Sequence, residues 1–218
     1  MIVDLYLKGG LVIIVGTGAE GLKKINSLLT QDCEILVIGK TSNPIIEKHI
    51  KAKEIEFIKA DLDDGKFLLK YKPVLVMATT NDRKLNCDIV KKARKIPGCM
   101  VYASDDPDFS DFSHPSVINI RNTVQVTVST SGKSPAMARE IRMRAEKPLN
   151  ALVTKEDIVQ INLQHTARMA AKRSISNQTM RKKYLYAVMR DSEVIRLIKQ
   201  DRIKMARNRA MDMLKEFE

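Results

Sequence analysis

The chain has 218 residues, which is enough for one sizeable domain or for a domain with a smaller annex. Its hydrophobic fraction of 44% is ordinary for a globular protein, and the lack of Trp, with five Phe and five Tyr, argues against a stacking platform for RNA bases. The net charge of +12 favours anionic partners, either nucleic acid or a polycarboxylated small molecule, although a solvated helical surface is the commoner explanation.

The cysteines indicate a reducing compartment. Cys33, Cys87 and Cys99 are widely spaced and form no C-x-x-C pair, so reduced thiols are expected rather than disulfides or a metal site. The N-terminus lacks the pattern of a signal peptide, and no apolar stretch approaches the length of a membrane span. We expect a soluble cytoplasmic protein without a membrane partner or a bound metal.

The most informative segment is a glycine-rich turn near the N-terminus. The apolar run Leu11–Val15 leads directly into Gly16-Thr17-Gly18-Ala19-Glu20-Gly21, which has the G-x-G-x-x-G spacing of a dinucleotide-binding loop. The glycines permit a sharp turn, close approach to the pyrophosphate and tight packing of the next helix, whose N-terminus attracts the phosphates. Glycine triplets also occur in ordinary turns, but the strand before and the helix after favour cofactor binding by Gly16, Thr17, Gly18 and Ala19.

The first hundred residues alternate apolar strands with amphipathic helices. The pattern predicts strands at Leu11–Val15, Glu34–Ile38, Ile55–Ile58, Val74–Ala78 and Met100–Ala103. It predicts helices at Glu20–Leu29, Pro44–Lys53, Asp64–Leu69 and Asp82–Lys95, with Asn43 capping the second and the segment Thr80-Asn81-Asp82 capping the last. Five strands at this spacing predict an α/β fold with a Rossmann-like parallel sheet.

The character of the chain changes after Asp105. Residues 104–115 form a polar, acidic loop, and two strands follow at Val117–Arg121 and Val124–Thr130, joined by a turn at Asn122-Thr123. Ser134 and Pro135 begin a helix that extends to about Arg144. From Thr154 onward the sequence is helical, opened by an imperfect capping box with Asp157 in place of Glu.

The ends of the predicted strands define one crevice. In an open parallel sheet the ligand lies outside the carboxyl ends of the strands, where the additional cofactor-binding candidates are Gly39, Lys40, Thr79, Thr80, Asn81 and Ser104. The second strand ends without the acidic residue that binds the adenosine ribose, and Lys40 would favour a 2′-phosphate. The residues alone therefore leave NAD and NADP both open.

Several motifs occur in an order that resembles precorrin-2 dehydrogenase, the NAD-dependent component of siroheme synthase, over essentially the whole chain. They are Leu5-Tyr6-Leu7-Lys8-Gly9-Gly10, Gly16-Thr17-Gly18, Ala78-Thr79-Thr80-Asn81-Asp82 with Asn86, Asp105-Asp106-Pro107 with Phe112 and Pro115, and the segment from Ser129 to Arg139. The last motif, Ser-Thr-x-Gly-x-Ser-Pro-x-x-x-Arg, is the most specific. Tyr102 departs from the pattern, because the family commonly has Asn there.

The resemblance implies NAD as cofactor and oxidation of the tetrapyrrole precorrin-2 to sirohydrochlorin. It also implies a homodimer, with residues 1–115 as the NAD-binding Rossmann domain, 116–150 as the dimerisation segment and 151–218 as a basic helical domain. Some members of the family also insert ferrous iron into the product, so iron is a potential co-substrate.

Asp105 is the candidate catalytic base. Removal of hydride from the macrocycle leaves a cation that must lose a proton, and a carboxylate beside the nicotinamide can accept it. The alternative is that Asp105-Asp106-Pro107 is simply a tight turn. Candidate substrate-binding residues are His114, Ser131, Lys133, Ser134 and Arg139, because basic and polar groups would contact the carboxylates of the tetrapyrrole.

A second hypothesis comes from a different class of protein. A nucleotide-sensing Rossmann module, with a basic helical tail that binds a partner or nucleic acid, would also explain the glycine loop and the charge of residues 151–218, which hold 15 Lys and Arg against 8 Asp and Glu. It would not explain Asp105 or the segment from Ser129 to Arg139.

Overall fold

The computed structural model describes residues 2–62 and 65–217. The chain folds into two compact units, Met1–His114 and Pro115–Glu218, and each is considered by itself. The division into three parts expected from the sequence stays a prediction.

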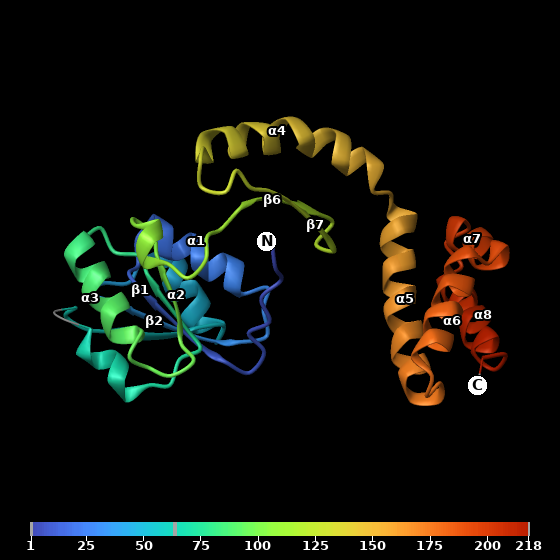
Figure 1. Cartoon of the computed structure of the whole chain (residues 1–218), viewed down its shortest axis with the longest axis horizontal. Coiled ribbons are helices and arrows are strands. Elements are labelled where there is room, and N and C mark those ends of the chain that lie inside the picture. Colours follow the sequence, from blue (N-terminus) through green and yellow to red (C-terminus); the bar gives the residue numbers. More distant parts are fainter. Residues whose placement is uncertain (1, 63–64, 218) are drawn as a thin grey trace. The chain divides into compact units, whose positions relative to one another are not determined.

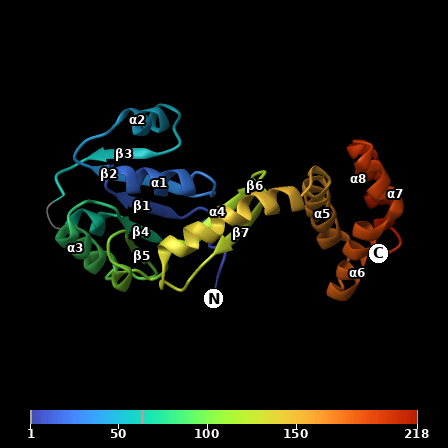
Figure 2. The same ribbon diagram turned by 90° about the horizontal axis from the view of Figure 1, so that it is seen from above.

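The first unit is built on a parallel sheet of five strands. These are β1 (Leu11–Val15), β2 (Glu34–Gly39), β3 (Glu56–Lys59), β4 (Leu75–Ala78) and β5 (Met100–Ala103). They lie in the order β3-β2-β1-β4-β5, so the chain crosses over between β3 and β4 and leaves a switch point beside β1 (Figure 2). The predicted Rossmann-like fold is confirmed.

Helices cover both faces of this sheet (Figure 1). Helices α1 (Ala19–Leu28) and α2 (Pro44–Lys51) share one apolar core with Val12 and Ile14 of β1. Helix α3 (Arg83–Ala93) shares the other core with Ile13 and Val15. Side chains alternate across a strand, so β1 must be apolar at every position to fill both cores. That requirement explains the unbroken apolar run in the sequence.

Two connections differ from the expected elements. The predicted helix Asp64–Leu69 begins at a residue outside the described part of the chain, and a short 3₁₀ helix, η1 (Lys66–Lys70), occupies the rest of that range. The acidic loop contains a second 3₁₀ turn, η2 (Pro107–Phe109), and then returns along the free edge of β5. There the Asp111 backbone N–H donates to the Val101 carbonyl, and the Val101 N–H donates to the Asp111 carboxylate. The loop therefore pairs the polar groups of an edge strand.

The second unit opens with an antiparallel hairpin of β6 (Ser116–Ile120) and β7 (Val124–Val128). The predicted turn at Asn122-Thr123 is wrong by one residue. The Thr123 N–H donates to the Ile120 carbonyl, and Arg121 and Asn122 occupy the central positions with φ of 51° and 52°. Asn tolerates this left-handed conformation well, and the two-residue turn matches the twist of the strands.

Helix α4 (Pro135–Leu152) packs against both strands of the hairpin. Its N-terminus is as predicted, because the Ser134 hydroxyl accepts a hydrogen bond from the Met137 N–H. The helix continues well past Arg144, the predicted end, and includes Pro148. A proline inside a helix removes one backbone donor, and here it does not stop the helix.

Four further helices form a separate core in this unit (Figure 1). They are α5 (Lys155–Ser174), α6 (Gln178–Arg190), α7 (Ser192–Lys199) and α8 (Ile203–Leu214). The predicted capping box is present, since Thr154 and Asp157 bond reciprocally at the start of α5. At the centre, the buried Tyr184 hydroxyl donates to the Ala210 carbonyl at 2.8 Å. No described helix combines the length and apolarity of a transmembrane segment.

Candidate functional site

The glycine loop joins β1 to α1 in a conformation that its glycines require. Gly16 has a φ of +120°, and a Cβ there would lie 2.8 Å from the backbone of Thr79. A Cβ on Gly21 would collide with the Gly16 carbonyl oxygen. These two glycines therefore let the chain turn out of the sheet and let α1 pack against the turn.

Gly18 has a different role, because the space beside it is open. No heavy atom lies within 4 Å of a Cβ built on Gly18, the residue at the N-cap of α1. A side chain caps each of the helices α2 to α7, whereas α1 has no side-chain cap. Its first N–H groups are thus left for another acceptor, and the positive end of the helix dipole favours an anion. The loop fits a dinucleotide pyrophosphate.

The end of β2 lies next to this loop. A Cβ on Gly39 would be 2.6 Å from the methyl group of Thr17, and the Asn43 amide donates to the Thr17 carbonyl at 3.0 Å. Lys40 follows Gly39 and is exposed. At the end of β2, where an acid would bind the adenosine ribose, the chain therefore has Gly39 and then the exposed cation Lys40.

The ends of β4 and β5 are connected through one buried amide, that of Asn86 on α3. Asn86 is 1% exposed. Its Oδ1 accepts from the Thr80 N–H at 3.1 Å and from the Thr80 hydroxyl at 2.7 Å. Its Nδ2 donates to the Thr80 carbonyl at 2.9 Å and to the Asp105 carboxylate at 2.8 Å. The amide is fully used, so it fixes Asp105 relative to β4.

The two acids of the turn have different hydrogen-bond partners. Asp106 accepts from Arg83 at 2.7 Å and from the Asp108 N–H, and the Arg83 guanidinium lowers the pKa of the Asp106 carboxyl. Asp106 therefore stabilises the turn. Asp105 is exposed, and Asn86 is the residue that holds it. Of the two, Asp105 is available for a bound substrate.

The other cofactor candidates lie at the same edge of the sheet. Thr79 is buried and its hydroxyl donates to the Val15 carbonyl at 3.0 Å, which ties β4 to the glycine loop. Asn81 is exposed beyond β4, and Ser104 follows β5, with its N–H donating to the Ala78 carbonyl. The structure thus brings the carboxyl ends of β1, β2, β4 and β5 together, in the order in which the strands pair.

His114 lies in an aromatic cluster. Its ring meets Tyr102 edge-on at 4.9 Å between centroids and Phe112 at 5.4 Å, and the Lys24 ammonium lies 4.4 Å from the Tyr102 ring centre. Part of the residue is exposed, yet loss of solvent around the ring, with the nearby Lys24, lowers the pKa of His114 to about 4. The imidazole is therefore neutral at pH 7. The ring can donate or accept a hydrogen bond, but it carries no charge.

The remaining substrate candidates lie in the second unit. Ser131 has a φ of 53° in the turn after β7, and Lys133 is exposed there. Ser134 already caps α4 through its hydroxyl, so its role is at least partly structural. Arg139 is exposed on the second turn of α4. Their relation to the glycine loop stays a prediction.

Two features at the site have only weak signals in the sequence. The link from Asn86 to Asp105 joins residues 19 positions apart on different elements, and Asn86 stands out only as part of a motif. Lys24 resembles an ordinary helix lysine, although it is only 8% exposed and burial lowers its pKa. A signal exists, because Lys24 falls on the same helical face as the buried Gly21 and Leu28. Among the described residues, no group of three or more His, Cys, Asp or Glu could hold a metal ion.

Comparisons with known proteins identify two family matches in the chain. Residues 3–116 match the family described as "Putative NAD(P)-binding", and residues 121–144 match "Sirohaem biosynthesis protein central". A protein named siroheme synthase from Photorhabdus laumondii is 33% identical over 144 residues, covering 64% of this chain and 29% of the relative. A siroheme synthase from Buchnera aphidicola is 31% identical over 180 residues, covering 82% of this chain and 36% of the relative.

The chain therefore spans about a third of the length of these curated relatives. Among solved structures, one titled "SirC, precorrin-2 dehydrogenase" has a TM-score of 0.67 at 18% identity, covering 96% of this chain and 99% of that chain, which shows a shared fold. The resemblance expected from the motifs is confirmed. Since the first match takes in half of the chain, the protein belongs to the putative NAD(P)-binding family.

Proposed function

We propose that this protein is an NAD-dependent precorrin-2 dehydrogenase that produces sirohydrochlorin for siroheme biosynthesis. The observation that carries the proposal is the exposed Asp105 carboxylate, held by the buried Asn86 amide at the same edge of the sheet as the glycine loop, whose helix α1 has no side-chain cap. A nucleotide sensor needs the loop, but it has no need of a fixed carboxylate there. The names of the relatives support the same reaction.

In the proposed reaction the cofactor takes the hydride and a side chain of the protein takes the proton. When bound, NAD⁺ would supply the acceptor for one hydride from a carbon of the macrocycle, and the macrocycle would be left as a cationic intermediate. Asp105 accepts the proton that this intermediate then loses, and releases it to solvent. The products are sirohydrochlorin, NADH and one proton. Asn86 acts as a positioning residue, because its amide holds one carboxylate oxygen and leaves the second free for the substrate.

The choice of NAD over NADP rests on the family resemblance, since Lys40 would accept either nucleotide. Lys40 is exposed and no acid stands at the end of β2. If Lys40 contacts a 2′-phosphate, the Lys40→Ala variant should lose affinity for NADPH alone. We expect NADH to bind the wild type and this variant equally, as a fluorescence titration with both reduced nucleotides would show.

We also propose a homodimer formed through the hairpin and α4. This segment exposes five large apolar side chains, those of Val117, Met137, Ile141, Met143 and Leu152. Met137 and Ile141 are one helical turn apart on α4, so they form a continuous apolar strip that a second copy can cover.

The reaction and the unpaired thiols suit a reducing compartment, the cytoplasm.

Anaerobic turnover of enzymatically generated precorrin-2 tests the proposed function. With the full chain and NAD⁺, we expect the absorption of sirohydrochlorin to grow in step with that of NADH. Ferrous iron, added afterwards as a co-substrate, would reveal whether siroheme forms faster than it does without protein. Tight binding of NAD⁺ with no oxidation, together with tight, sequence-selective binding of DNA at physiological salt, would instead favour the nucleotide-sensing alternative.

A further inference from the structure

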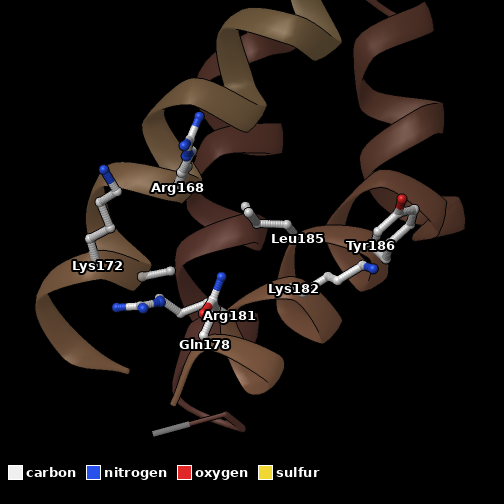
Figure 3. Close-up of a pocket in the computed structure, with 8 residues that line it drawn as sticks. Arg168, Lys172, Gln178, Arg181, Lys182, Leu185 and Tyr186 are labelled. Carbon is white, nitrogen blue, oxygen red and sulfur yellow. The ribbon is translucent and has the colours of Figure 1, made fainter. Parts of the chain in front are cut away.

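A cavity of about 440 Å³ lies between α5 and α6 of the second unit, a size within the range of small-molecule pockets. Figure 3 shows its lining, with side chains from both helices around the opening. The lining residues are Arg168, Ala171, Lys172, Gln178, Arg181, Lys182, Leu185 and Tyr186. Four of these eight are cations and none is an acid.

The sequence around the cavity contains no acid to neutralise these cations. Residues 158–190 include seven Lys and Arg and not one Asp or Glu. Elsewhere in the same unit, cations pair with carboxylates: Arg196 bonds Glu193, and Arg209 bonds Asp191. Among the residues the structure describes, none of the four cavity cations forms an ion pair. Their mutual repulsion is thus left for a ligand to relieve.

Helix termini explain only part of this arrangement. Lys172 lies in the last turn of α5, where a cation favourably meets the negative end of the helix dipole. Arg168 lies one turn earlier, and Arg181 and Lys182 lie in the first turns of α6, where a cation is unfavourable. Arg181 is half-buried and donates to the Ile175 carbonyl at 3.3 Å, so its guanidinium is already ordered. Neither a helix terminus nor such a bond accounts for Arg168 and Lys182.

The remaining walls select the kind of anion. Ala171 and Leu185 give the cavity an apolar side, and the Tyr186 ring lies 6.0 Å from the Lys182 ammonium. An inorganic phosphate would not use the apolar surface. A molecule with carboxylates around an apolar ring system would use both the cations and the apolar wall. Arg forms bidentate hydrogen bonds with carboxylates, and the apolar body would cover Leu185 and Tyr186.

We propose that this cavity binds the carboxylates of an organic polyanion with an apolar body, the chemical class to which the tetrapyrrole substrate belongs. The identification of that polyanion as the substrate rests on the proposed function. The binding of the class rests on the cavity alone. Arg168 and Arg181 are the principal carboxylate ligands, with Lys172 and Lys182 on either side.

Binding of uroporphyrin, a stable tetrapyrrole rich in carboxylates, tests the proposal. The full chain would be titrated by fluorescence at two salt concentrations, as wild type and as two cavity variants, Arg168→Gln/Arg181→Gln and Lys172→Gln/Lys182→Gln. The matched control is Arg173→Gln/Lys183→Gln, which removes the same charge from the same helices outside the cavity lining. Thermal unfolding of each variant would verify the fold.

We expect the arginine variant to weaken uroporphyrin binding by about tenfold to a hundredfold, because each lost bond is to a charged group. The lysine variant should show a smaller loss in the same direction, and the control less than about a threefold change. Pyrophosphate should compete poorly. Equal losses in the control and cavity variants would overturn the proposal, as would tighter cavity-dependent binding of pyrophosphate or of a single-stranded DNA oligonucleotide. If the wild type did not oxidise precorrin-2, the proposed function would be refuted, but the measured binding of uroporphyrin to the cavity would still stand.

Discussion

Asp105 and Asn86 show how a single side chain can be placed by another that is buried. The Asn86 amide has all of its hydrogen bonds occupied by Thr80 and Asp105. A buried amide with no spare bonding capacity cannot rotate without leaving a partner unpaired. The Asp105 carboxylate is therefore fixed, although it is itself exposed.

The Asn86→Asp variant tests this positioning role. A carboxylate at position 86 keeps the shape and the acceptor for the Thr80 N–H, but it loses the bonds to the Thr80 carbonyl and to Asp105 and places a like charge against Asp105. We expect kcat to fall by about tenfold to a hundredfold and the acid limb of the kcat/KM profile to move to higher pH, since a neighbouring negative charge disfavours an ionised base.

The control for that variant is Thr80→Val, which removes only the Thr80 hydroxyl. It should lower stability by about 1–3 kcal/mol, because the hydroxyl bonds both Asn86 and the backbone of Asp82 and each bond contributes about 1 kcal/mol net, and it should leave the pH profile unchanged. If Asn86→Asp and Thr80→Val had the same pH profile, Asn86 would be a purely structural residue.

His114 is the second residue whose environment can be measured. Its pKa near 4 in the folded protein lies below its ordinary value of 6.5. The unfolded state therefore binds more protons between these two values, so the stability contributed by His114 is present above pH 6.5 and decreases as pH falls through this window. We expect its NMR signals to titrate near pH 4. Titration near 6.5 would mean that the imidazole does not pack against Tyr102 and Phe112.

At the scale of elements, the junction of β1 and α1 separates the structural from the binding role of glycine. Gly21 has no room for a methyl group, whereas Gly18 has open space and an ordinary extended backbone. Gly21→Ala should lower the free energy of unfolding by about 1–3 kcal/mol, the usual range for overpacking. Gly18→Ala should fold normally and weaken NADH binding by about tenfold or more.

Chemical denaturation and a fluorescence titration of NADH distinguish these two effects. The Gly18→Ala variant with wild-type stability and wild-type affinity would show that the loop does not contact a pyrophosphate. A stable Gly21→Ala variant would show that α1 can move away from β1, against the close packing seen in the structure.

The elements themselves are largely predictable, for identifiable reasons. The predicted bounds of β1 and β5 match the observed ones, because unbroken apolar runs with clear turn residues on both sides define buried strands. The hairpin turn is displaced by one residue, since the decisive property is a left-handed backbone at Arg121 and Asn122. The end of α4 is not predictable, because Pro148 is a usual stop signal and the helix nevertheless continues through it to Leu152.

The candidate site is predictable only in part. The strand ends that form it are predictable from the apolar runs, because the carboxyl ends of parallel strands lie at one edge of the sheet. The bonds that select Asp105 over Asp106 depend on where α3 places Asn86 and Arg83, and no spacing rule contains that information. The α5–α6 cavity likewise depends on which faces of two helices meet. The acid-free stretch of residues 158–190 is its one visible signal.

For the whole molecule, the proposed homodimer through α4 is the prediction that is simplest to measure. Met137 and Ile141 are 48% and 38% exposed on α4, a large apolar surface for a helix in water. Light scattering on the wild type should give twice the mass of one chain, and Met137→Asp/Ile141→Asp should give a folded monomer. A monomeric wild type would exclude this interface, as would a dimer that is insensitive to both substitutions.

The central claim is that Asp105 is the base of a precorrin-2 dehydrogenase, and single-turnover oxidation of precorrin-2 under saturating NAD⁺ tests it most directly. The comparison is Asp105→Asn against Asp108→Asn, which removes an exposed carboxylate from the same turn. We predict a loss of about a hundredfold or more in Asp105→Asn, with NADH affinity unchanged and Asp108→Asn equal to the wild type. Equal rates in the two variants would contradict the assignment of Asp105 as the base.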